Sequence, residues 1–245
     1  MRSFPPIRES YKNFDAFAFI ASGAVDLGTG PAWSSDTARG TGAGTTELEL
    51  YNGVWVNKNA ITLRFGTASG DTVSVAARQA THLGSFRCTA NGQTEDSLTK
   101  RFLFNAYNRR RRAMRRLEST TSWTYSTASY QQANAAAANQ LDFLIGLSEE
   151  AVTARLRATC ENGTGGAILA QVALGLDSVS AAAAGATVAG FSLATATRRY
   201  QLGAEYSGYP GLGRHYLAWL EKVTATGTTT WYGASENGLQ GEVHA

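Results

Sequence analysis

The chain has 245 residues, enough for one large all-β domain or two small ones with a sizeable core. Hydrophobic residues make up 43% of the chain and charged residues only 17%, a share below the roughly 25% of an average soluble domain. Six of the 22 basic residues lie in one short run, and the remaining 16 are fewer than the 19 acidic residues. The net charge of +3 is therefore local, which argues against a nucleic-acid-binding surface along the whole chain.

The N-terminal stretch MRSFPPIRESYKNFDAFAF has prolines where a signal peptide needs an apolar run. No stretch reaches the ~20 apolar residues of a membrane span. Cys88 and Cys160 stand far apart without a CxxC motif, so neither a disulfide framework nor a zinc site is indicated. We expect a protein made in a reducing cytoplasm, without a membrane partner, a metal or another cofactor.

Residues 1–46 differ from the rest. The stretch GTGPAWSSDTARGTGAGTT offers almost nothing to a core, and it predicts an extended arm that precedes a separate domain over residues 47–245. Three aromatic residues of the arm are candidates for anchoring it on a neighbouring subunit: Phe14, Phe17 and Trp33.

From Glu47 onward, apolar and polar residues alternate in many short runs. ELELYNGVWVNK has Asn52 and Gly53 between two strand-like runs, a strong hairpin signal because both turn residues tolerate positive φ. AVTARLRATC alternates in the same way and turns Cys160 inward as a buried thiol. Two Ala-rich patches, ANAAAANQ and SAAAAGA, are expected to be loops, one with a helical turn. The pattern predicts an all-β protein, an antiparallel β-sandwich of jelly-roll type.

Motifs of catalysis are missing from the sequence: there is no GxSxG, HExxH, GK[ST] or EF-hand spacing. His82 and His215 share their parity with apolar neighbours, which indicates packing at a sheet. Two adjacent acidic pairs, Glu95 with Asp96 and Glu149 with Glu150, are expected to be solvated turn residues. We therefore expect no enzymatic activity.

Four aromatic residues could form a platform for a sugar ring. SWTYSTASY places Trp123 and Tyr125 on one parity, and TTTWYG adds Trp231 and Tyr232. The alternative is that these side chains belong to the core or to a subunit interface.

The basic run NRRRRAMRRLE contains Arg109, Arg110, Arg111, Arg112, Arg115 and Arg116. As a strand, the run places Arg110 and Arg112 on one face and Arg109 and Arg111 on the other, so it must face solvent or a partner. A helix is the alternative, since Arg, Ala, Met and Leu favour helix. Arginines pair with carboxylates as well as with phosphates, and the rest of the chain is net acidic, so contact with another subunit is preferred to phosphate contact.

Several runs resemble a family of bacteriophage virion proteins that are encoded among phage structural genes. The runs keep their order and cover most of the chain from Ala24 to Gly233. They are AVDLGTGPAWSSDTARGTGAGTTELELYNGVWVNKNAITLRFG, ANGQTEDS, KRFLFNAYNR, SWTYSTASYQQAN, GLDS and PGLGRHYLAWLEKVTATGTTTWYG. The arginine run departs from the family pattern, which is much less basic there. The family pattern contains no catalytic residues to transfer.

The resemblance implies a non-enzymatic fibre, spike or decoration subunit of the virion, assembled in the host cytoplasm. Such a subunit would form a homo-oligomer, as a trimer or another cyclic assembly, and would contact other virion proteins. A glycan-binding host-adhesion module is the second hypothesis, with Trp123, Tyr125, Trp231 or Tyr232 at the site. A capsid-interior protein that contacts DNA through the arginines is the third.

Overall fold

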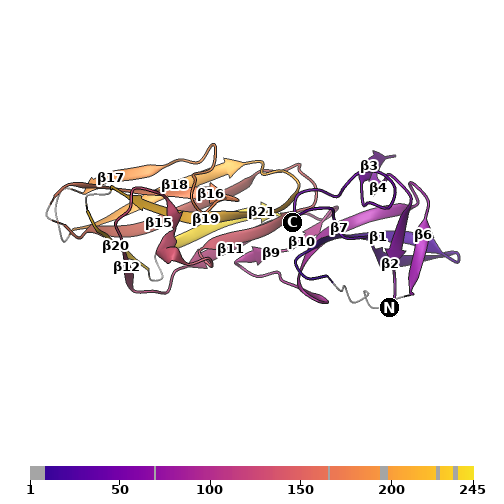
Figure 1. Cartoon of the computed structure of the whole chain (residues 1–245). Coiled ribbons are helices and arrows are strands. Elements are labelled where there is room, and N and C mark those ends of the chain that lie inside the picture. Colours follow the sequence, from indigo (N-terminus) through magenta and orange to yellow (C-terminus); the bar gives the residue numbers. More distant parts are fainter. Residues whose placement is uncertain (1–8, 69, 165, 194–197, 225–226, 234–236) are drawn as a thin grey trace.

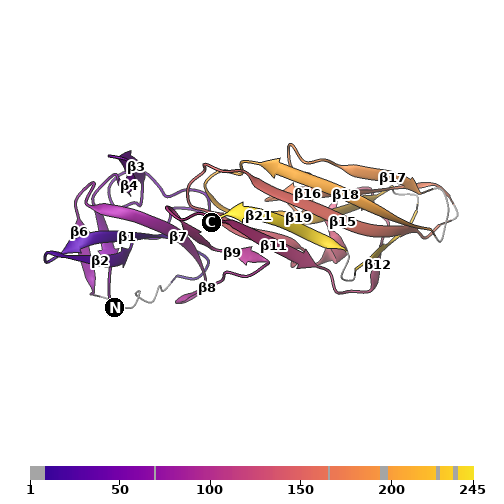
Figure 2. The same cartoon turned by 180° about the vertical axis from the view of Figure 1, so that it is seen from behind.

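The computed structural model describes residues 9–68, 70–164, 166–193, 198–224, 227–233 and 237–245. The molecule is elongated and consists of two lobes placed end to end (Figure 1), and Figure 2 shows the same arrangement from behind. The fold is all-β, as the sequence predicts. Every strand pairing among the described residues is antiparallel except that of β9 with β14.

The first lobe is built on one curled sheet, which has nine strands within the described residues. Its order is β3-β4-β7-β1-β2-β5-β6, and β8 and β10 also pair with β7. The strands are β1 (Asn13–Ala21), β2 (Ala24–Thr29), β3 (Leu48–Tyr51), β4 (Val54–Asn57), β5 (Ile61–Arg64), β6 (Thr72–Val75), β7 (Ala80–Ala90), β8 (Gln93–Thr94) and β10 (Leu103–Asn105).

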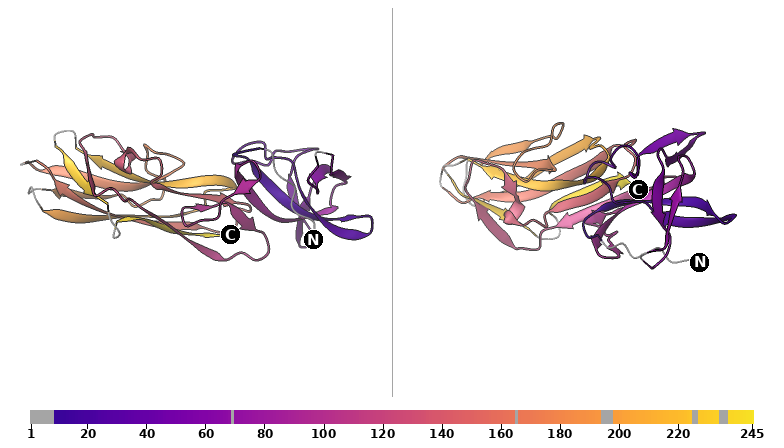
Figure 3. Two further views of the ribbon diagram at one scale, coloured as in Figure 1. Left: turned by 90° about the horizontal axis from the view of Figure 1, so that it is seen from below. Right: turned by 45° about the vertical axis from the view of Figure 1, so that its right-hand side comes forward.

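The second lobe is a β-sandwich of two sheets, each with six strands within the described residues (Figure 3). The first sheet contains β11 (Arg111–Leu117), β12 (Ser122–Tyr125), β15 (Val152–Asn162), β18 (Arg199–Gly208), β20 (Thr229–Tyr232) and β21 (Gly238–His244). The second contains β9 (Lys100–Arg101), β13 (Gln131–Gln132), β14 (Gln140–Ile145), β16 (Ile168–Leu176), β17 (Ala189–Leu193) and β19 (Gly213–Val223). Apolar side chains from both sheets meet in one core.

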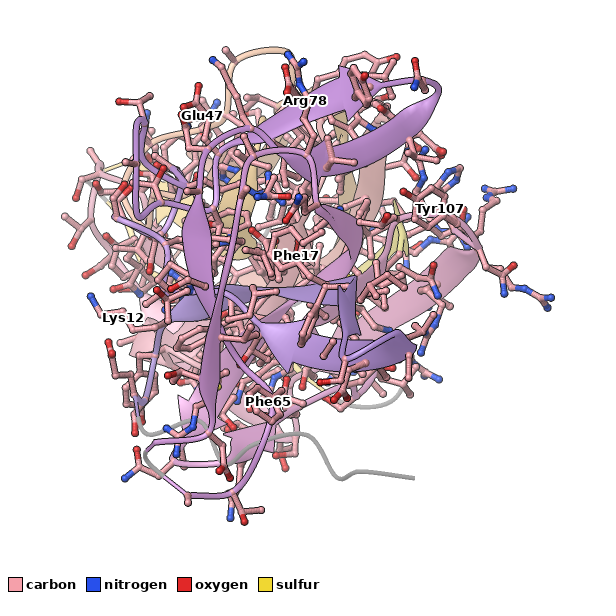
Figure 4. All side chains as sticks on the ribbon, turned by 90° about the vertical axis from the view of Figure 1, so that its right-hand side faces the viewer. Lys12, Phe17, Glu47, Phe65, Arg78 and Tyr107 are labelled. Carbon is pink, nitrogen blue, oxygen red and sulfur yellow. The ribbon has the colours of Figure 1, made fainter. Side chains whose placement is uncertain are left out.

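The expected extended arm is wrong for residues 13–29. These residues form β1 and β2, and β1 lies between β7 and β2 inside the first sheet. Phe17 lies near the middle of the first lobe (Figure 4), and Phe14 and Trp33 are buried as well, so all three belong to this chain's own core. The alternation of Phe17 and Phe19 provides one apolar face of β1. Residue 47 is therefore no domain boundary.

Several local predictions are confirmed. Asn52 and Gly53 form the turn between β3 and β4, both with positive φ. In β15 the predicted alternation holds, and Cys160 is buried. The first Ala-rich patch carries a single 3₁₀ turn, η1 (Ala133–Ala135).

One short segment joins the two lobes. Residues 100–101 form β9 in the second lobe, and residues 103–105 form β10 in the first. Between them, Phe102 packs with Trp33 of the first lobe and Leu144 of the second. The junction thus contains a small buried cluster of its own, unlike a flexible linker.

Candidate functional site

A groove of about 800 Å³ lies on the outer face of the second lobe, over β11, β21, β15 and β18. Three arginines line it, Arg111, Arg115 and Arg155, and we call it the arginine groove. Two of the three come from the basic run that the sequence singles out.

The register of the four strands explains the hollow. One cross-strand row carries mostly small side chains, and the next row carries long polar ones. The first row is Ala113, Glu242, Thr153 and Ser207; the second is Arg115, Gln240, Arg155 and Glu205. Small side chains beside long ones leave the floor of the groove low along the first row.

Two segments form the walls of the arginine groove by covering the sheet's edges. Along β11, the Arg115 backbone N–H donates to the Leu98 carbonyl at 2.7 Å. Along β18, the Thr187 N–H donates to the Glu205 carbonyl at 2.8 Å, and the Glu205 N–H donates to Thr187 Oγ1 at 2.7 Å. Backbone groups that an edge strand would otherwise expose are occupied at these points.

Charges of both signs lie in the groove. Arg111 forms an ion pair with Glu242 across the β11–β21 ladder. Arg155 donates one hydrogen bond to Gln240 Oε1 at 3.1 Å and is exposed. Glu205 stands on β18 on the far side of Arg155. The lining therefore offers both guanidinium donors and carboxylate acceptors.

The basic run is a strand from Arg111, so the helical alternative is wrong for residues 111–117. Its alternation is the expected one: Arg111 and Arg115 face the groove, whereas Met114 points into the core. Arg110 is exposed, and its backbone pairs with Ala245.

Carboxylates that pair with the run come from this same chain. Arg109 pairs with Glu149 at 2.6 Å, and Arg112 pairs with Asp96 at 2.5 Å. Arg116 Nε donates to Asn139 Oδ1 at 3.1 Å. Of the four acidic residues expected to be merely solvated, Asp96, Glu149 and Glu150 are thus partners of these arginines, whereas Glu95 pairs with Lys100. Contact of the run with another subunit stays a prediction.

The four aromatic residues do not form one platform. Trp231 is fully buried in the sandwich core, and Trp123 and Tyr125 pack against that core from β12. Only Tyr232 turns to the outer face, where it donates to Glu161 and Arg199 stacks on its ring. The predicted glycan contact of Trp231 is therefore wrong for this structure, because no face of its ring is accessible.

Inside the sandwich lies a carboxylate that the sequence analysis overlooked. Glu221 of β19 is fully buried and accepts hydrogen bonds from Trp123 Nε1 at 2.8 Å, Gln131 Nε2 at 2.8 Å and the Asn134 N–H at 3.1 Å. Burial raises the pKa of Glu221 to about 7, although these three donors oppose the rise. Glu221 shares its parity with the apolar residues Leu217, Trp219 and Val223, and this is the sequence pattern that indicates its burial.

A second buried polar cluster contains Asp15, His82 and Ser85, the residue types of a nucleophilic triad. Ser85 Oγ donates directly to Asp15 Oδ1 at 2.6 Å, and His82 Nε2 lies 3.2 Å from the same oxygen. In a catalytic triad the histidine stands between the serine and the acid, whereas here the carboxylate occupies the centre. All three side chains are buried, so the cluster is structural.

Arg39 completes this cluster. Burial alone would raise the pKa of Asp15, but the Arg39 guanidinium and the hydrogen bond with His82 outweigh it and hold that pKa well below its usual value. His215, the other histidine expected to be structural, is also buried and lies 2.7 Å from Asp177 through Nδ1.

Among the described residues, no three His, Cys, Asp or Glu side chains are grouped closely enough to hold a metal ion. The same residues include no helix of the length and hydropathy that crossing a membrane requires.

No protein-family model matches the sequence, and no curated protein matches it. Among solved structures, the chain aligns over its full length with the mosquito-larvicidal Cry4Aa toxin from Bacillus thuringiensis, at 6% identity and a TM-score of 0.25, and spans 54% of that chain. It also aligns over its full length with a structure of infectious bursal disease virus Gx strain, at 10% identity and a TM-score of 0.20, over 82% of that chain. The chain thus spans about half the length of the toxin. TM-scores of this size do not indicate a shared fold, so neither protein informs the function of this chain.

Proposed function

We propose that this chain is a non-enzymatic structural subunit of a bacteriophage particle, a surface fibre, spike or decoration protein that assembles as a homo-oligomer. The observation that carries the proposal is the packed and hydrogen-bonded junction between two all-β lobes. The sequence resemblance between Ala24 and Gly233 supports it independently.

Stiffness at the junction has three sources. Residues 100–105 supply strands to both lobes. Arg39 of the first lobe donates to the Gly146 carbonyl of the second at 2.9 Å. The Asp36 carbonyl of the first lobe accepts from the Arg214 N–H of the second at 2.8 Å. A subunit that projects from a particle needs such an inflexible elongated body.

The contact between copies is proposed on the outer face of the β1–β2 hairpin, at the end of the first lobe away from the sandwich (Figure 1). Ile20 and Val25 face each other across this hairpin and are 64% and 71% exposed. Leu27 stands beside them, 40% exposed. Exposed apolar groups that lie together mark interaction sites. The occupant we propose is a second copy of the chain, since the aromatic residues first expected to anchor a neighbour are buried in their own lobe.

Light scattering on the purified chain tests the contact. We expect a homo-oligomer for the wild type and a smaller mass for Val25→Glu, because a charge in the contact is costly to bury. Val179→Glu is the matched control, since Val179 is an exposed apolar residue of the second lobe. A monomeric wild type, or equal masses for Val25→Glu and the wild type, would contradict the proposed contact.

Mass spectrometry of purified phage particles tests the virion role separately. We expect peptides of this chain in particles that have been banded by density. Their absence from the particles would overturn the structural role, whatever the oligomeric state of the isolated chain.

A further inference from the structure

We propose that the arginine groove binds a saccharide that carries carboxylate groups, such as a uronic or sialic acid. This inference goes beyond the architectural role and does not depend on it. It also moves the proposed glycan-binding site to another part of the molecule, because the aromatic residues first considered for glycan binding mostly face the core.

The groove has the dimensions of a ligand site. Its volume of about 800 Å³ lies within the roughly 300–1,000 Å³ of small-molecule pockets. Its floor consists of four hydrogen-bonded strands, so the side chains that line it are held on a rigid support. Ala113, Thr153 and Ser207 keep the floor low and let a ligand approach the sheet.

Arg155 is the residue that we assign to the ligand's carboxylate. It stands in the middle of the floor, between Gln240 on β21 and Glu205 on β18. A guanidinium has five N–H donors in a planar fork, and its bond to Gln240 uses one of them. Such a fork matches the geometry of a carboxylate, as it also does that of a phosphate, through two parallel hydrogen bonds.

The neighbours of Arg155 suit the hydroxyl groups of a sugar. Glu205 and Gln240 offer acceptors, whereas Thr153 and Ser207 can both donate and accept. A ring with several hydroxyls and one carboxylate would meet a complementary group on each side.

The same neighbours disfavour nucleic acid. Glu205 and Glu242 lie in the groove beside the three arginines, so its lining carries almost balanced charge. A phosphate backbone carries a charge at every nucleotide, and carboxylates in its path would repel it. Strand addition by an acidic peptide is disfavoured as well, because Leu98 and Thr187 already occupy backbone positions along the two edges of the groove.

Isothermal titration calorimetry on the full chain tests the inference. The carboxylated probes are galacturonate and sialyllactose, which carry one carboxylate each, and the neutral probes are galactose and lactose. We expect saturable binding of at least one carboxylated probe, and at least about tenfold weaker binding of its neutral counterpart, which is about 1.4 kcal/mol.

Three variants locate the binding. Arg155→Gln should weaken it at least about tenfold, and Ala113→Trp should abolish it by filling the floor while it leaves every charge in place. Arg157→Gln is the matched control: Arg157 lies on the same strand and the same exposed face but outside the groove lining, so binding should be unchanged. Circular dichroism confirms that each variant is folded.

Three outcomes would overturn the inference. The first is that neither carboxylated probe binds the wild type. The second is that Arg155→Gln and Arg157→Gln reduce binding equally. The third is that a short DNA duplex binds with steep salt dependence while both carboxylated saccharides fail to bind, which would indicate phosphate contact instead.

Discussion

The guanidinium of Arg39 holds the carboxylate of Asp15 through two hydrogen bonds, Nε to Oδ2 at 2.7 Å and Nη2 to Oδ1 at 2.9 Å. Nη2 of the same side chain also donates to the carbonyl of Gly146 in the second lobe. A buried ion pair of the first lobe is thereby hydrogen-bonded to the backbone of the second lobe. Trp33 Nε1 donates to the same Asp15 carboxylate at 2.9 Å.

Asp15→Asn should therefore destabilise the protein by about 3–5 kcal/mol, because it leaves the Arg39 charge buried without its partner. Urea unfolding followed by tryptophan fluorescence measures the loss. Glu49→Gln is the control, since the Glu49–Arg78 pair lies at the surface and should leave the unfolding midpoint nearly unchanged. Equal midpoints for the two variants would contradict a structural role for the buried pair.

Gly213→Ala should weaken the junction between the lobes. Gly213 has φ +118°, and a Cβ there would collide with the Asp36 carbonyl oxygen and come within 2.5 Å of Thr37 Cα. Gly211 has φ +103° but open space around it, so Gly211→Ala costs only the backbone strain, about 1–2 kcal/mol. We expect Gly213→Ala to lower the free energy of unfolding by at least about 1 kcal/mol more. If the two variants unfold at the same urea concentration, the contact with Asp36 is unimportant.

Stability should fall with rising pH because of Glu221. Its pKa is raised by burial from 4.5 to about 7, so the folded state keeps a proton that the unfolded state releases. The contribution is present below pH 4.5 and is lost as the pH rises to about 7, and it amounts to about 3 kcal/mol. Urea midpoints at several pH values measure it.

Glu221→Gln should remove this pH dependence, since the amide stays neutral throughout. The lowered pKa of Asp15, held down by Arg39 against the effect of burial, places that group's titration below this window, so it does not interfere. Parallel pH profiles for the variant and the wild type would show that Glu221 ionises normally.

Both cysteines should be unreactive in the folded protein. Burial raises the pKa of the Cys160 thiol to about 12 and that of Cys88 to about 11, and the reactive thiolate is correspondingly scarce. Ellman's reagent at pH 8 should label neither thiol in buffer and both in urea. Rapid labelling of the native protein would mean that the core around at least one cysteine opens.

The fold class could be predicted because period-two alternation depends only on neighbouring residues. The position of residues 13–29 in the first sheet could not be predicted, because Asp15 is a buried charged residue whose partner, Arg39, lies outside this range. A charge in a strand indicates an exposed position unless its partner is known, and here the partner is 24 residues away.

For the candidate site, the alternation of the arginines was predictable and their surroundings were not. Arg111 meets Glu242 across a separation of 131 residues, and the row that holds Arg155 depends on the pairing of β11, β21, β15 and β18. Alternation also leaves open which face of a strand is the inner one. For that reason Trp123 and Tyr125 could be read as a sugar platform although they pack on the core.

The pairing of β11 with β21 has a consequence for biosynthesis. β11 is the first strand of its sheet in chain order, yet its partner is β21, the last strand among the described residues, which also brings Leu239 and Val243 to the core. A nascent chain leaving the ribosome must therefore keep the sandwich open until β21 has emerged. Formation of the contact between the lobes is delayed as well, because Arg39 can donate to the Gly146 carbonyl only after β14 has been synthesised. Closure of the sandwich thus depends on β21, and a product truncated before β21 would expose the interior of its second lobe.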